Sequence, residues 1–167
     1  MPAVWQVQRV KPTLFSIFLW DGCGNFSWLS YVTLAACSPD GKNVYYSNMV
    51  YFPGGGASLF TGATDYLTNT KLTGDMTNGY TLYYPDGSHD VYGFIVPALS
   101  VGWQPEAYRT QHWDAYSNAI TFVYSTSGSS IQLTNVIDAT GGTNWIYYGS
   151  TNVQFPNLIT QVMDRYG

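Results

Sequence analysis

Few side chains in this 167-residue sequence could carry out acid–base chemistry. It has two histidines, His89 and His112, one glutamate, and nine aspartates. Ser58, with His89 and an aspartate, has the composition of a serine-hydrolase triad, which is defined by geometry and not by order in the chain. The Gly-x-Ser-x-Gly motif of α/β hydrolases is missing, and nothing in the sequence brings these residues together. Ser58, His89 and His112 are therefore only candidates, and no catalytic residue is predicted.

The densest polar cluster is Pro85–Asp90. Asp86 and Asp90 offer carboxylate oxygens for calcium or another divalent cation, and His89 is a potential transition-metal ligand. Calcium takes six to eight oxygens, which two carboxylates do not supply. Pro-Asp-Gly between two apolar stretches is typical of a hairpin turn. We therefore predict a turn and no cofactor, with a divalent-cation site as the alternative.

The composition indicates an all-β protein. Aromatic residues make up 17% of the chain and charged residues only 10%, with fifteen tyrosines and seventeen glycines. Strand formers and turn formers in these proportions argue against helices. The length suits one domain with a sizeable core. The net charge is −4 with six scattered basic residues, which argues against nucleic-acid binding, and no apolar run is long enough to span a membrane.

A hexapeptide occurs three times in the C-terminal half, at Arg109–Asp114, Leu133–Asp138 and Ile159–Asp164. Its final aspartates are 24 and 26 residues apart, a period typical of stacked supersecondary units. Aspartate opens tight turns and glycine closes them, because glycine readily adopts positive φ. We therefore predict strands that end in hairpin turns. The structural residues of these turns are Asp114, Asp138, Gly141, Asp164 and Gly167.

Each unit continues with an alternating strand that closes on tyrosine. Tyr124 and Tyr148 both stand ten residues after a turn aspartate. In the first unit Ser117 replaces the turn glycine and Arg109 the first apolar residue, so we predict that this unit is irregular or lies at an edge. His112 is in its strand, beside Trp113, and is expected to pack or to form a hydrogen bond.

These motifs resemble the RHS/YD-repeat family, whose repeats run Leu-Thr-x-Val-x-Asp-x-x-Gly and close on tyrosine. Asp138–Gly141 and Tyr147–Tyr148 carry the likeness, and Asn25–Thr33, Tyr51–Gly56 and Tyr80–Ser88 are similar to the segment that precedes the repeats in secreted bacterial members. The resemblance implies a sheet of antiparallel hairpins that spirals into a hollow shell. It also implies an extracellular or cell-envelope location and a non-catalytic role in encapsulating or presenting another polypeptide.

The sequence divides into an N-terminal arm at residues 1–24, a β-rich segment at 25–100, and the repeats at 101–167, within one compact unit. The predicted boundary is Pro97–Pro105, because proline and glycine interrupt strands there. Within the middle segment, Val44–Tyr46 and Met49–Phe52 are typical of a strand pair. Gly54–Gly56 follows them without the Lys-Ser/Thr of a phosphate-binding loop, which favours a turn or a bulge.

The N-terminal arm lacks the features of a signal peptide. Asp21 and Gly22 interrupt its apolar run, and no small-residue cleavage site follows. Cys23 and Cys37 stand 14 residues apart. In an exported protein they could form a disulfide, and two separate thiols are the equal alternative. With no other cysteine, a structural zinc site is not predicted.

The favoured function is that of a structural repeat fragment without chemistry of its own. The first alternative is a small metal-assisted or serine-type hydrolase acting on esters or lactones. Six tryptophans and fifteen tyrosines also allow a carbohydrate-binding module. The chain stops at the glycine that would open another hairpin, so self-association through the C-terminal strands, or pairing with further repeats, is expected. Ile131, Leu133, Ile159 and Val162 are predicted to lie in or beside this uncapped edge.

Overall fold

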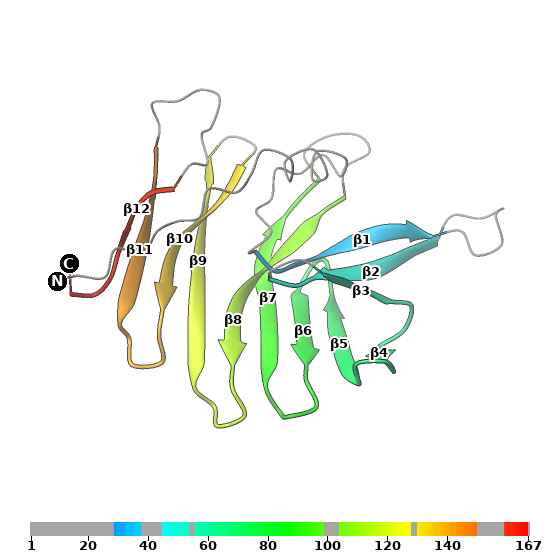
Figure 1. The fold of residues 1–167 in the computed structure, drawn as a ribbon. Coiled ribbons are helices and arrows are strands. Elements are labelled where there is room, and N and C mark those ends of the chain that lie inside the picture. Colours follow the sequence, from blue (N-terminus) through cyan, green and yellow to red (C-terminus); the bar gives the residue numbers. More distant parts are fainter. Residues whose placement is uncertain are drawn as a thin grey trace.

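The computed structural model describes residues 29–37, 45–53, 56–98, 104–127, 130–149 and 159–166. Within them the protein is all-β without a helix, as the sequence predicts (Figure 1). The arm at 1–24, Cys23, the Cys37 side chain, Gly167 and most of the triple glycine lie outside the described residues. The strands are β1 (Tyr31–Cys37), β2 (Tyr45–Tyr51), β3 (Ala57–Phe60), β4 (Thr64–Asp65), β5 (Thr70–Asp75), β6 (Gly79–Tyr83), β7 (His89–Val96), β8 (Glu106–Trp113), β9 (Ala119–Ser127), β10 (Ser130–Ile137), β11 (Thr143–Tyr148) and β12 (Ile159–Met163).

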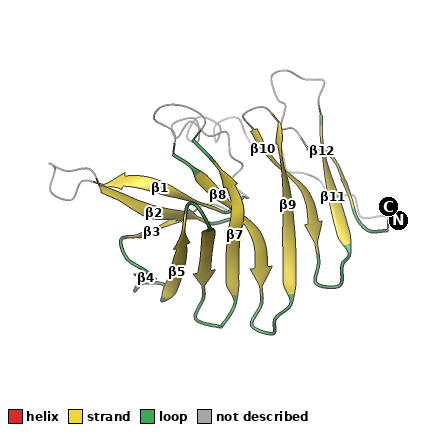
Figure 2. Ribbon diagram, turned by 180° about the vertical axis from the view of Figure 1, so that it is seen from behind, coloured by secondary structure: helices red, strands yellow, loops and turns green. Residues whose placement is uncertain are grey.

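Strands β4 to β12 form an open antiparallel sheet in chain order. The turns β6–β7, β8–β9 and β10–β11 lie along one rim of this sheet, at the bottom of Figure 1. Strand β8 pairs with two further strands besides β7. Its first part, Glu106–Tyr108, pairs with β1, and its last part, Gln111–Trp113, pairs with β9. Strand β2 joins β1, and β3 joins β2. Seen from behind, β1, β2 and β3 cross the strands of the β4–β12 sheet at a steep angle (Figure 2).

The crossing encloses the core, because both layers present apolar side chains to it. One buried cluster joins Val32, Val50 and Phe60 of β1–β3 to side chains of β5–β8 such as Leu82 and Tyr92. A second cluster joins the start of β1 to the repeats. Each of these large side chains contributes about 1.5–3 kcal/mol by leaving water. The members of the second cluster are Leu29, Tyr31, Val96, Tyr108, Ile131 and Leu133.

One feature of the middle segment differs from the sequence-based expectation. Val44–Tyr46 and Met49–Phe52 do not form a strand pair, because β2 runs unbroken from Tyr45 to Tyr51 and pairs along its length with β1. The long cross-strand ladder outweighs the turn preference of the Ser-Asn between them. Strands β7 and β8, on the two sides of the predicted boundary at Pro97–Pro105, pair directly with each other, so one sheet contains both segments.

The repeat turns share one hydrogen-bonding pattern. The Asp114 amide donates to the Asn118 carbonyl and the Ser117 amide to the Asp114 carbonyl, and Asp138 heads the same pattern with Gly141 and Gly142. In both turns the aspartate Oδ1 accepts backbone N–H groups two and four residues on. The Oδ1 of Asp164 likewise accepts the Tyr166 amide. Asp114 and Asp138 therefore open hairpin turns, and the glycine predicted for the turn at Asp164, Gly167, lies outside the described residues.

The first unit does not lie at an edge, but its ladder is irregular as predicted, because β7 and β8 shift register twice where the ladders of the other two units shift once. Ser117 adopts a φ of 68°, close to the 85° of Gly141, and closes the same turn. Arg109 takes the apolar position by stacking on the Phe122 ring, 4.6 Å from its centroid. The turn hydrogen bonds outweigh the small cost of a left-handed serine. Strand β8 lies inside the sheet, between β7 and β9.

The threonine at the second position of each hexapeptide is a bulged residue. The ladders skip Thr110, Thr134 and Thr160 as they pass from one strand to the next. Each hydroxyl donates to a carbonyl of the preceding strand at 3.1–3.2 Å, and the acceptors are Val91, Val123 and Tyr147. Bulges bend a sheet and increase its twist. The repeat therefore places a bend in the sheet at every unit.

The closing tyrosines hold each unit to its own first residue. The Tyr124 hydroxyl donates to the Arg109 carbonyl at 2.7 Å, and the Tyr148 hydroxyl donates to the Leu133 carbonyl at 2.9 Å. Both bonds join residues 15 apart. We call this contact the tyrosine latch. It fixes the second strand of a unit against the first, across the bulge.

Candidate functional site

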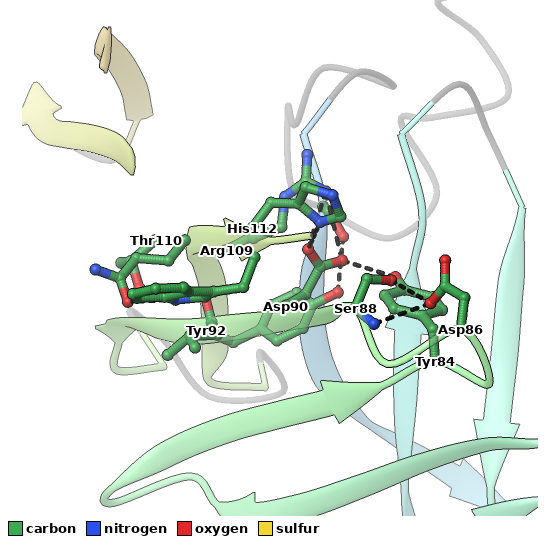
Figure 3. Close-up of polar contacts among 12 residues, drawn as sticks. Tyr84, Asp86, Ser88, Asp90, Tyr92, Arg109, Thr110 and His112 are labelled. Carbon is green, nitrogen blue, oxygen red and sulfur yellow. Dashed lines mark hydrogen bonds and ion pairs between the residues drawn. The ribbon is translucent and has the colours of Figure 1, made fainter. Parts of the chain in front are cut away.

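A cluster of polar side chains surrounds Asp90 on β7 (Figure 3). Asp90 is only 1% exposed. The Tyr84 hydroxyl donates to its Oδ2 at 2.7 Å, and Nδ1 of His112 lies 2.7 Å from its Oδ1. Nη1 of Arg109 lies 3.4 Å from both oxygens. The two short contacts dominate the geometry, and the guanidinium supplies the compensating charge at longer range.

Strand register positions this cluster. Asp90 pairs with Leu82 on β6 and with His112 on β8, and Leu82 is fully buried, so this row faces the core. A carboxylate there requires partners, because an unpaired buried charge is costly. Burial, followed by the hydrogen bond to Asp90, strongly raises the pKa of the Tyr84 hydroxyl, which therefore stays a donor. The arrangement fits a buried carboxylate satisfied by protein donors.

The candidate metal ligands Asp86, His89 and Asp90 have separate contacts. Asp90 is held by protein donors, and Asp86 accepts the backbone N–H and the hydroxyl of Ser88 within its own turn. That turn is the predicted hairpin, closed by Gly87 with φ 89°. Across the described residues, no three His, Cys, Asp or Glu side chains are grouped so that they could hold a metal ion.

The catalytic candidates have separate partners. The Ser58 hydroxyl donates to Asp65 Oδ2 at 2.6 Å, not to a histidine. His89 lies on the opposite face of β7 from Asp90, and its ring stacks between those of Tyr83 and Trp113 with centroids 5.7 and 5.8 Å away. The faces of the imidazole ring are thus used in cross-strand packing. Ser58 and His89 do not form a triad with the contacts described here.

His112 forms a hydrogen bond, which is one of the two roles expected from the sequence. Its partner is the carboxylate of Asp90. In hydrolases with a Ser-His-Asp triad, a buried carboxylate orients the imidazole that acts as the general base. The His112 side chain is 35% exposed. Sequence reasoning missed Arg109 and Tyr84 as partners of Asp90. The available signal was Arg109 itself, a charged residue at an apolar position of the repeat.

The outer edge of β12 is the second candidate site. Strand β12 pairs with β11, and among the described residues no strand pairs with its other side. Val162, at 60% exposure, lies on it. The prediction that Ile131 and Leu133 belong to this edge is wrong: β10 lies two strands inside, and both side chains are buried in the second core cluster. Ile159 and Val162 do lie on the edge strand.

The turn aspartates predict a dependence of stability on acid pH. Hydrogen bonds from Asn118 and from Thr140 hold the pKa of Asp114 and of Asp138 below the ordinary 3.8. The unfolded chain then takes up protons first as the pH falls, so the free energy of unfolding should decrease below about pH 4. Urea titrations at a series of pH values measure this. Asp114→Asn with Asp138→Asn should flatten the slope, and an unchanged slope would contradict the assignment.

Comparison with models of known protein families gives no match, and comparison with curated proteins gives no significant match. No helix in the described part of the chain is long and apolar enough to cross a membrane.

Proposed function

We propose that this chain is a non-catalytic structural module, a bent β wall that forms part of a shell encapsulating or presenting another polypeptide. The observation that carries the proposal is the bulged threonine, which recurs at Thr110, Thr134 and Thr160 with the same carbonyl contact. A bend repeated at every unit turns a flat sheet into a curved one. The resemblance of the motifs to RHS/YD repeats points to the same role outside the cytoplasm.

The use of the polar side chains supports this proposal. The turn aspartates cap backbone amides, the bulge threonines and latch tyrosines bind carbonyls, and Asp90 joins β7 to β8. Each of these contacts sets the path of the backbone. In a repeat protein, contacts within each repeat and contacts between neighbouring repeats both contribute to the stability.

A wall of this kind is expected to continue at β12. An exposed edge with few charges pairs readily with another strand. We predict that the isolated chain self-associates at micromolar concentration, which sedimentation velocity measures directly. Val162→Lys should shift it toward monomer, because lysine on an edge strand opposes pairing. Val123→Lys is the matched control, because Val123 is 37% exposed on β9, inside the sheet.

A chain that stays monomeric as its concentration rises would contradict the predicted association. Equal effects of the two lysine variants would show that charge in general, and not the β12 edge, controls it.

The second candidate function, a small ester or lactone hydrolase, is favoured by the Asp90–His112 contact alone. Assays of the purified chain on ester and lactone substrates, with and without a chelator, distinguish the structural module from the hydrolase. Turnover that is lost in His112→Ala but retained in Ser58→Ala and His89→Ala, with all three variants folded, would establish a dyad at Asp90. The structural proposal expects no turnover that depends on any of these residues.

A further inference from the structure

We propose that the β12 edge selects an antiparallel strand that carries a tyrosine, whose hydroxyl donates to the carbonyl of Ile159. This inference rests on the proposed function and deepens it by naming the chemistry of the partner. The partner is an uncharged extended strand of another polypeptide, with the pattern of this chain's own β11. It would bind by strand addition, in which main-chain bonds provide affinity and one side chain provides selectivity.

The chain contains two examples of this recognition. Where β9 lies on β8, Tyr124 donates to the first hexapeptide residue, Arg109. Where β11 lies on β10, Tyr148 donates to the corresponding residue, Leu133. The acceptor is in each case a carbonyl beside the bulged threonine, so the bulge and the latch recur together.

Strand β12 has the first half of this arrangement. Ile159 is the first residue of the third hexapeptide, and Thr160 beside it is bulged and bonded to Tyr147. Among the described residues, no tyrosine hydroxyl donates to the Ile159 carbonyl. The edge thus repeats the surface that β10 presents to β11.

The chemistry of β12 narrows the choice of partner. The strand Ile159–Met163 carries no charge, which favours a neutral strand and gives no support to a basic or acidic peptide. Arg165, just beyond it, is engaged by the Thr140 hydroxyl at 3.0 Å and by Asp138. Strand β11, Thr143–Tyr148, is also uncharged and ends in the latch tyrosine. Its sequence is therefore the natural probe.

The experiment measures binding of a fluorescent peptide of residues 141–149, with lysines added at its ends for solubility, to the full chain. The Tyr148→Phe peptide should bind about three- to tenfold more weakly, since it lacks one hydrogen bond. The matched control is Tyr147→Phe, because Tyr147 is exposed and points to the other face. This control peptide should bind like the parent. Hydrogen exchange should slow at the amides of β12 when the parent peptide is present.

Equal binding of the parent and Tyr148→Phe peptides would overturn the inference while leaving the edge as a strand acceptor. Failure of every peptide to bind, or protection at a strand other than β12, would also overturn it. The structural function is judged separately, by sedimentation of the chain alone.

Discussion

Replacing Gly79 by alanine is expected to destabilise the fold by about 3 kcal/mol or more, because two backbone conflicts coincide there. Gly79 begins β6 with φ 91°, and a Cβ at this position would lie 2.5 Å from the Tyr92 carbonyl oxygen. The neighbouring backbone cannot move away easily, because Tyr80 pairs with Tyr92, which is fully buried. Urea unfolding followed by far-UV circular dichroism measures the loss.

Gly141→Ala is the matched control. Gly141 has nearly the same conformation, φ 85°, but a Cβ there would meet nothing within 4 Å. This variant therefore measures the left-handed strain alone, about 1–2 kcal/mol. Similar losses in the two variants would mean that strain is the whole cost and that the β6–β7 contact is more compliant than its geometry indicates.

Asp90→Asn is expected to cost about 3 kcal/mol, because the partly buried guanidinium of Arg109 loses its counter-charge. The asparagine side chain keeps the shape of the aspartate, but its N–H₂ group faces other hydrogen-bond donors and cannot accept from them. Tyr84 and Arg109 are such donors, and Asp90 accepts from both. This cost comes from removing one charged partner and leaving the other. The net contribution of the whole cluster to stability is smaller, because apolar side chains of similar shape could replace it. Chemical denaturation at neutral pH measures it.

Asp86→Asn is the control for charge removal without burial. Asp86 is exposed, and its carboxylate accepts from Ser88 within the turn, so a much smaller loss is expected. Tyr84→Phe removes one donor from Asp90 and should cost about 1 kcal/mol. An Asp90→Asn variant as stable as the parent would show that the cluster contributes nothing to folding.

The sequence predicted the features that local chemistry determines. The period of the hexapeptide, with aspartate at its end, placed the turns at Asp114, Asp138 and Asp164, where the carboxylates cap backbone amides. Pro-Asp-Gly placed the β6–β7 hairpin for the same reason. Turn geometry depends on four or five consecutive residues, so a short motif is sufficient to predict it.

Contacts between distant segments were not predictable in this way. The Ser30 hydroxyl meets the Tyr92 hydroxyl across 62 residues, and β1 joins β8 only because both layers share a core. The convergence of Tyr84 and Arg109 on Asp90 depends on the register of three strands. The threonine at the second position of each hexapeptide could be seen in the sequence. The alternation of side chains along a strand does not, however, reveal where a bulge makes the hydrogen-bonded ladder skip a residue.

The tyrosine latch has an evolutionary consequence. It joins two residues of the same unit, and the threonine bond reaches only to the strand before, as Thr134 does to Val123. A duplication or deletion of one whole unit, 24 to 26 residues, would therefore preserve every contact of this kind. Insertion of a few residues within a strand would break them. Selection can thus change the length of such a wall by unequal recombination in whole units, while the interior of each unit resists change.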